Sequence, residues 1–218
     1  MKPILFNTEM ARAILEGRKT VTRRVVRPQP TFFYKYGGKI ADPDNPDNIA
    51  FLTMAEKNGE DKEEICVPPY QPGSILYVRE TWYYETFYED TDNAPDLPSG
   101  KRSWRYVYKA DNPDYPVIPG HWHPSIHMPR EAARIFLRVT NVRVEQLQDI
   151  TDDDMARDFD FCLNAIKAVG RDALAGPFWD KTIKPADRAL YGWEANPWVW
   201  VIAFERISKE KAYEKLFD

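Results

Sequence analysis

The spacing of hydrophobic positions changes from a helical to a strand-like period at Gly17. Residues 8–16 carry apolar side chains at helical spacing, with Thr8 placed to cap a helix and Gly17 placed to end it. After the glycine, β-branched residues alternate with polar ones, which predicts a strand. Alternate residues of a strand share a face. The two predicted faces are Thr20, Thr22 and Arg24 on one side, and Lys19, Val21, Arg23 and Val25 on the other.

Similar patterns predict further strands and a few short helices. The clearest strands are residues 74–82, 135–144 and 198–204, which are rich in β-branched and aromatic residues. A helix is expected over 152–168, because Thr151 can cap it and the aspartates that follow favour a helix N-terminus. Weaker patterns predict strands at 3–7, 82–88 and 104–109, the last two as a hairpin, a tail helix at 208–217, and irregular structure over 170–196.

Residues 31–66 interrupt this pattern and are expected to form an insertion on a single domain that spans residues 1–218. Six or seven strands with hairpin-like connections and two or three short helices favour an α+β fold. We therefore expect a mixed β-barrel with flanking short helices and inserted loops rather than a parallel α/β sheet. Within the insertion, we expect a hairpin of 31–36 and 39–41 over Gly37-Gly38, a loop at 42–48, and a solvated turn or helix at 56–64.

Composition and charge narrow the function. A hydrophobic content of 43% argues for a folded protein rather than a disordered one. The net charge of −4 gives no overall attraction to nucleic acid, but residues 1–27 hold seven basic residues against two acidic ones, which predicts a local basic face. Cys66 and Cys162 provide no disulfide framework, and no apolar run resembles a signal or a membrane span. We expect a cytoplasmic protein, in a bacterial or phage-infected cell, with no membrane partner.

Two groups of polar residues are open to more than one interpretation. Lys19, Thr22 and Arg24 fit either an exposed basic strand edge or a ligand site. Arg79 and Glu80 end a buried strand, where polar groups are either paired ions or site residues.

All three histidines lie within residues 121–127, a spacing that suggests a metal site. However, no cysteine is near, and two of the histidines flank Trp122 and would point to opposite sides of an extended chain. His127 and Arg130 better fit residues that fix a loop or line a pocket. We expect neither a metal ion nor a cofactor.

Residues 17–24, with the helix before them, resemble the signature G-x-K-x-x-T-x-R of the ASCH family, whose members share a PUA-like β-barrel. More narrowly, the chain resembles phage- and prophage-encoded ASCH-like proteins. The resemblance covers residues 1–30 and about 70–205. Four further blocks in the same order support it: residues 72–82, 124–130, 147–151 and 191–200.

The resemblance implies a basic cleft that binds RNA or another nucleotide-containing ligand. Some small bacterial ASCH proteins are amidohydrolases that remove the acetyl group of N4-acetylcytidine with a lysine, a threonine and a glutamate. Those roles fall on Lys19, Thr22 and, for the carboxylate, Asp158, while the signature arginine falls on Arg24. Relatives usually have Glu-Gly where this chain has Asp158-Phe159, so the carboxylate is one methylene shorter here.

Three functions therefore stay open. In a hydrolase, Thr22 would be the nucleophile, Lys19 its base, and Asp158 or Glu80 an orienting carboxylate. In a binding protein, Arg18, Arg23, Arg24 and Arg27 would contact phosphates, and the ligand would be RNA, another single-stranded nucleic acid or a modified nucleoside. In a phage accessory protein, aromatic loops would bind a protein partner. The candidate ligand-binding residues are Arg18, Arg23, Arg24, Glu80, Trp82, His127 and Arg130.

Overall fold

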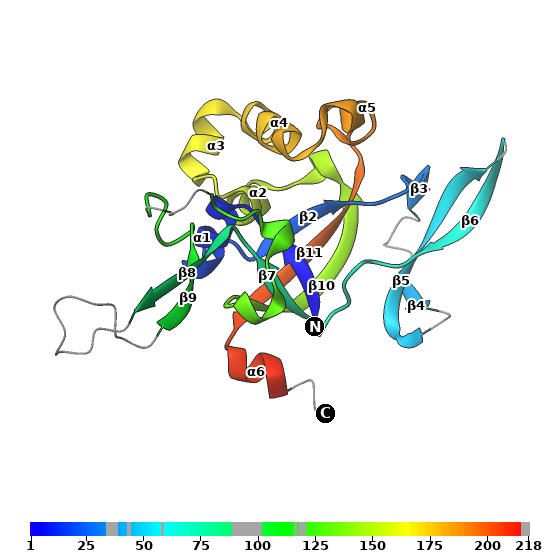
Figure 1. The fold of residues 1–218 in the computed structure, drawn as a ribbon. Coiled ribbons are helices and arrows are strands. Elements are labelled where there is room, and N and C mark those ends of the chain that lie inside the picture. Colours follow the sequence, from blue (N-terminus) through cyan, green and yellow to red (C-terminus); the bar gives the residue numbers. More distant parts are fainter. Residues whose placement is uncertain are drawn as a thin grey trace, which may run out of the picture.

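The protein is a mixed α+β structure built around a five-stranded sheet (Figure 1). The computed structural model describes residues 1–33, 39–42, 45–57, 59–88, 102–115, 117 and 121–214. The strand order in the sheet is β1 (Lys2–Leu5), β7 (Ile75–Arg79), β10 (Phe136–Gln146), β11 (Trp198–Ile207) and β2 (Val21–Val25). β1 is parallel to β7, and the other neighbours are antiparallel. The strands predicted at 3–7, 74–82, 135–144 and 198–204 are confirmed, with β10 and β11 longer than expected.

Both faces of this sheet are covered, as the alternation along β11 shows. Trp200, Ile202 and Phe204 pack into one hydrophobic cluster, which also contains side chains from β1, β7 and the β5 strand described below. Val199 and Val201 point the other way, into a second cluster under the helices. Because burial of each large apolar side chain contributes about 1.5–3 kcal/mol, the two clusters fix the position of β11 and of its neighbour β2.

Helix α1 (Thr8–Leu15) connects β1 to the turn before β2. Its N-cap is Asn7, whose side-chain oxygen accepts a hydrogen bond from the backbone N–H of Met10 at 2.8 Å, so the prediction of Thr8 as the cap is wrong by one residue. The predicted end of the helix is correct, because Gly17 adopts a φ of +75°, which a residue without a Cβ adopts at little cost.

Four helices follow β10 and gather on one side of the sheet (Figure 1). They are α2 (Asp152–Phe159), α3 (Leu163–Val169), α4 (Arg171–Thr182) and α5 (Arg188–Tyr191). The single helix predicted over 152–168 is wrong, because Asp160 has a left-handed φ of +62° and ends α2. The predicted Thr151 cap is present, with its hydroxyl accepting from Asp154 N at 3.1 Å.

The irregular structure predicted for 170–196 is also wrong, because α4 and α5 occupy much of it. Pro177 lies inside α4, where it removes one backbone donor, and this residue hid the helix from the sequence pattern. The helix is held by tertiary packing of Ala175, Gly176 and Trp179, which are all buried. Short 3₁₀ turns occur at Ser125–His127, Arg130–Ala132, Leu147–Asp149 and Pro185–Asp187.

A second sheet is formed by residues from 32 to 66. Its long strand β5 (Asn45–Lys57) pairs with β3 (Phe32–Phe33), β4 (Lys39–Asp42) and β6 (Glu60–Cys66). The predicted pairing of 31–36 with 39–41 is wrong, since both described strands pair with β5 instead, and Gly37-Gly38 lies outside the described residues. The loop predicted at 42–48 and the turn or helix predicted at 56–64 are largely strand. That this region is an insertion stays a prediction.

Two further elements match the sequence. β8 (Trp82–Tyr88) and β9 (Arg102–Tyr108) form the expected antiparallel hairpin, which projects from the body on the side opposite to β6 (Figure 1). Helix α6 (Lys209–Glu214) corresponds to the predicted tail helix at 208–217, of which residues 215–217 are not described.

The described residues contain eleven strands and six α-helices, more than the six or seven strands and two or three helices predicted. Across these same residues no sheet closes into a barrel, so the mixed α+β class is established and the barrel is not. None of the helices in the described ranges is long and apolar enough to cross a membrane.

Candidate functional site

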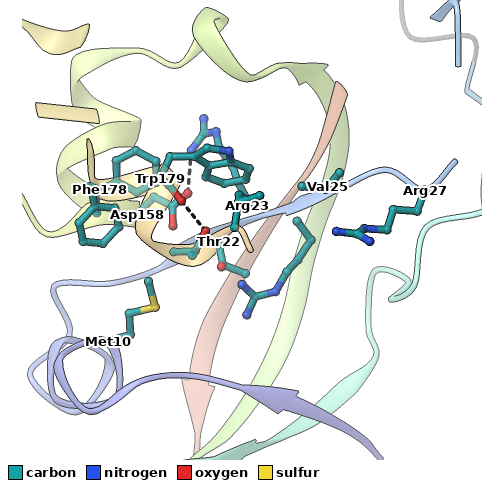
Figure 2. A pocket seen from close by; sticks show the side chains of 12 residues that line it. Met10, Thr22, Arg23, Val25, Arg27, Asp158, Phe178 and Trp179 are labelled. Carbon is teal, nitrogen blue, oxygen red and sulfur yellow. Dashed lines mark hydrogen bonds and ion pairs between the residues drawn. The ribbon is translucent and has the colours of Figure 1, made fainter. Parts of the chain in front are cut away.

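A cleft lies between β2, α1, α2 and α4, and several of the residues selected from the sequence line it (Figure 2). It consists of two adjoining cavities of about 280 and 670 Å³. Figure 2 shows Met10 of α1 facing Asp158 and Phe178 across the first cavity. The residues that line both cavities are Met10, Arg24, Asp158, Phe159, Phe178 and Thr182.

Lys19 and Asp158 form the floor of the larger cavity. Lys19 Nζ lies 2.6 Å from Asp158 Oδ1 and also donates to the backbone carbonyl of Asp158. The side chains are 0% and 3% exposed, respectively. Burial lowers the pKa of Lys19 from its ordinary value and the nearby arginines add to this effect, although the Asp158 carboxylate opposes it. The shorter side chain of aspartate is thus long enough to reach Lys19.

The other oxygen of Asp158 is bound by Arg23, whose side chain is completely buried. Arg23 Nη1 lies 3.1 Å from Asp158 Oδ2, and its Nη2 lies 3.0 Å from Asp154 Oδ2. Its Nε and Nη2 both donate to Glu145 Oε1, at 3.0 and 2.5 Å. One guanidinium therefore joins β2 to β10 and to two turns of α2, and its charge is taken up by three carboxylates.

Two outer arginines complete this network. Arg143 contacts Glu145 Oε2 at 3.2 Å and Asp154 Oδ2, and Arg157 Nη2 contacts Asp154 Oδ1 at 2.8 Å. Burial alone would raise the pKa of Asp154, but Arg143 and Arg23 hold it below its ordinary value. Asp154 was assigned from the sequence to the helix dipole alone, and the structure adds this ion-pair role.

Thr22 and Arg24 line the cleft from β2. Thr22 is 1% exposed. Arg24 is partly exposed, donates to the carbonyl oxygen of Leu5 at 2.9 Å, and lies 5.3 Å from the ring centroid of Phe6. Among the residues that the structure describes, no carboxylate lies within ion-pair distance of Arg24. Its charge is therefore available to a ligand.

The other basic residues near the cleft are less free. Arg18 pairs with Glu16 and with Asp160, and Arg27 lies 3.8 Å from Asp187 and stacks on a tyrosine ring. Lys181, which the sequence analysis did not select, lines the larger cavity from α4 and has no ion pair within the described part of the chain. Four cations of the predicted basic face, Arg18, Lys19, Arg23 and Arg27, are thus paired with carboxylates. Among the described residues, the cations at the cleft without an ion pair are Arg24 from that face and Lys181 from α4.

Five of the predicted ligand-binding residues line neither cavity: Arg18, whose ion pairs are given above, and four that lie elsewhere. Glu80 is buried and makes two bonds to Arg134, of 2.9 and 3.0 Å. Burial raises its pKa, although Arg134 opposes the shift. Of the two interpretations that the sequence left open for Glu80, a paired ion or a site residue, this arrangement matches the paired ion. Trp82 packs in a cluster with Tyr106 and His123, His127 is exposed in a 3₁₀ turn, and Arg130 lies over the ring of Tyr213.

Several residues of the site were missed from the sequence. The alternation of Arg143 and Glu145 along a predicted strand, and the spacing of four residues between Asp154 and Asp158, were the available signals. Neither signal says which basic residue the carboxylates meet. Phe178 lies in the region taken as irregular, so its place at the cleft could not be predicted.

The three histidines do not form a metal centre. His123 packs against the ring of Trp82 at 4.8 Å, between centroids, and is bridged to the Trp82 backbone. No group of three or more metal-ligating side chains comes together in the described ranges.

No family model, curated protein or solved structure matches the chain.

Proposed function

We propose that the cleft binds a nucleotide-containing ligand, with the base against the apolar wall and the phosphate at Arg24 and Lys181. The observation that carries this proposal is the position of two cations that have no ion pair among the described residues, beside Phe159, Phe178 and Met10 in a cavity of about 670 Å³. Pockets of a few hundred cubic ångströms with apolar walls and few polar groups are typical of small-ligand sites.

The charge distribution favours a mononucleotide, or a single nucleotide of an RNA, over an extended RNA strand. Arg23 cannot meet a phosphate because it is buried among carboxylates, and the charges of Arg18 and Arg27 are partly taken up by Asp160 and Asp187. An extended strand needs a row of free cations along its backbone. Within the described part of the chain, the cleft offers two cations without an ion pair.

The proposal includes the fold family. We take the five-stranded sheet as part of a PUA-like fold of the ASCH type, in which residues 17–24 form the floor of the ligand cleft. The placement of Lys19, Thr22, Arg24 and Asp158 around one cleft supports this assignment, because Asp158 follows Lys19 by 139 residues in the sequence and yet meets the three residues of the 17–24 segment there.

Titration calorimetry with cytidine 5′-monophosphate tests the proposal. Loss of one charged hydrogen bond costs about 1.5–3 kcal/mol, so Arg24→Gln and Lys181→Gln should each weaken binding by roughly tenfold to a hundredfold. Arg138→Gln is a matched control, because Arg138 is exposed, pairs with Glu205 and lies away from the cleft. Wild-type protein that is folded and binds neither this nucleotide nor a short single-stranded RNA would contradict the proposal.

The salt dependence of RNA binding separates one bound nucleotide from an extended contact. For single strands the slope of log K against log salt is about −0.7 per neutralised phosphate, so two cations predict a slope shallower than about −2. A much steeper slope would show that the RNA contacts further basic residues, and would overturn the assignment of the cleft as the main site.

A second candidate function is hydrolysis of an amide on the base, as in N4-acetylcytidine. It is favoured by the buried Lys19–Asp158 pair, whose carboxylate lines the same cavity as Thr22, since burial lowers the pKa of Lys19 and increases the fraction of neutral amine. In this reaction the Thr22 hydroxyl oxygen would bond to the acetyl carbon while its proton passes to Lys19. The C–N bond would then break with proton return to the cytosine nitrogen, and water would release acetate from Thr22.

Release of cytidine from N4-acetylcytidine, followed by chromatography, tests this second function. Thr22→Val and Lys19→Met should abolish release, whereas Thr22→Ser should retain part of it. Binding remains the first candidate because Lys19, Thr22 and Asp158 are nearly inaccessible, so a ligand meets the walls of the cleft before its floor. Nucleotide binding without any cytidine release would remove the hydrolase alternative.

A further inference from the structure

Asp158 divides its two carboxylate oxygens between Lys19, which lines the larger cavity, and Arg23, which lines the smaller cavity with a fully buried side chain. Oδ1 accepts from Lys19 Nζ at 2.6 Å, and Oδ2 accepts from Arg23 Nη1 at 3.1 Å. Rotation of this carboxylate would break both contacts at once. Its orientation is therefore fixed by Lys19 and Arg23 together.

Arg23 is itself held in place by groups that do not touch the cleft floor. Glu145 accepts from its Nε and Nη2, and Asp154 accepts from Nη2. These two carboxylates line neither cavity. They leave Nη1 aimed at Asp158, and they neutralise a charge that would otherwise compete with Lys19 for it.

We infer that Arg23 is a positioning residue for the cleft: it holds the Asp158 carboxylate in the orientation that engages Lys19. This inference rests on the proposed function, because it concerns the floor of the same cleft. It changes the role expected for Arg23 from the sequence, which was contact with phosphates. The residue acts on a ligand through Asp158 and Lys19, and the charge state of the floor depends on it.

The charged groups around Lys19 define what an experiment should detect. Asp158 faces it from α2, Arg23 and Arg24 act on it from β2, and the ring of Phe6 lies 5.7 Å from its Nζ. If Asp158 loses its fixed orientation while the positive charge of residue 23 remains, the protonated form of Lys19 loses stabilisation. The other charged groups that line the larger cavity are Glu9, Asp160 and Lys181.

The test is an NMR titration of the Lys19 side chain in ligand-free protein, with its signal assigned by its absence in Lys19→Met. Arg23→Lys keeps the charge but cannot reach Glu145 and Asp158 together, so the titration midpoint of Lys19 should fall below the wild-type value. Arg143→Lys is the matched control. Arg143 contacts Glu145 and Asp154 but not Asp158, so the same chemical change there should leave the midpoint unchanged.

Two results would overturn the inference: an unchanged Lys19 titration midpoint in folded Arg23→Lys, or an equal shift of that midpoint in Arg143→Lys. A purely structural role of Arg23 would lower the stability of the protein without a selective effect on Lys19. If Arg23→Lys does not fold, Glu145→Leu decides in the same way, since it removes the acceptor of Arg23 Nε and Nη2 and leaves Arg23 in the chain. Binding of cytidine 5′-monophosphate is measured separately. If wild type does not bind, the proposed function fails, and the titration still decides the positioning role.

Discussion

Lys19 and Asp158 are 139 residues apart in the chain and form an ion pair of 2.6 Å, with side chains that are 0% and 3% exposed. Transfer of two charges from water into a protein interior is costly, and the pair repays this cost only with good geometry and additional hydrogen bonds. Both are present, since Lys19 also donates to the Asp158 carbonyl and Arg23 binds the second carboxylate oxygen. The pair therefore specifies how α2 is placed against β2.

Removal of Asp158 alone should cost more than removal of both members of this pair. Asp158→Asn leaves the Lys19 ammonium buried without a counterion and should lower the free energy of unfolding by about 3–5 kcal/mol. Lys19→Met should cost less, because Asp158 keeps Arg23. The double variant should be more stable than Asp158→Asn alone, as measured by urea unfolding. Costs that simply add would show that the two side chains are not coupled.

The strands of the central sheet could be predicted because their side chains alternate between two buried clusters, as Val199 and Trp200 do. Helix α4 could not be predicted, because Gly176 and Pro177 are typical of loops and the helix depends on buried contacts with Trp193 and its neighbours. The strands β5 and β6 were missed because charged residues of a projecting hairpin have the same pattern as a solvated turn.

For the cleft, spacing drew attention to Lys19, Thr22 and Arg24, and the family resemblance added Asp158. Charge counting was misleading, because the carboxylates that neutralise Arg23 come from residues more than 120 positions away. A local excess of basic residues predicts a basic surface only if the rest of the chain leaves it unpaired. That condition depends on tertiary contacts, which one sequence without relatives does not contain.

The stability of the protein towards acid should depend on Asp154. Arg143 and Arg23 hold the pKa of Asp154 below its ordinary value of 3.8, so the charged form contributes stability above pH 3.8, and this contribution is lost as pH falls through the folded-state pKa. Asp154→Asn should therefore be less stable than wild type at neutral pH, with a difference that shrinks on acidification. Urea midpoints measured from neutral to acid pH test this.

The neighbouring residue provides the control for that prediction. Asp153 lies in the same first turn of α2 but is exposed, and only its backbone carbonyl bonds to Arg157. Asp153→Asn should therefore follow the wild-type pH dependence. A gap between wild type and Asp154→Asn that stays constant from neutral to acid pH would show that ionisation of Asp154 is not linked to folding.

Asn7, and not Thr8, should stabilise α1. Substitution of an N-cap asparagine by alanine costs about 0.5–2 kcal/mol, because a backbone N–H at the helix start loses its acceptor, here that of Met10. Asn7→Ala should thus lower the free energy of unfolding by roughly 1 kcal/mol, whereas Thr8→Ala should have little effect. Thermal or urea unfolding distinguishes the two, and the reverse order would place the cap where the sequence pattern predicted it.

The ring of Phe178 should provide the main stacking surface for the base of a bound nucleotide. It lines both cavities and is partly exposed, and its ring centroid lies 4.8 Å from that of Phe159, which is buried and packs against it. Base–aromatic stacking contributes about 1–3 kcal/mol, so Phe178→Leu should weaken binding of cytidine 5′-monophosphate by roughly fivefold to a hundredfold, and Phe178→Tyr should retain it.

Phe161 belongs to the same aromatic group but lines neither cavity, so Phe161→Leu is the matched control. Calorimetry that gave equal losses for the two leucine variants would show that the aromatic group supports the fold of α2 and α4 without contacting the base.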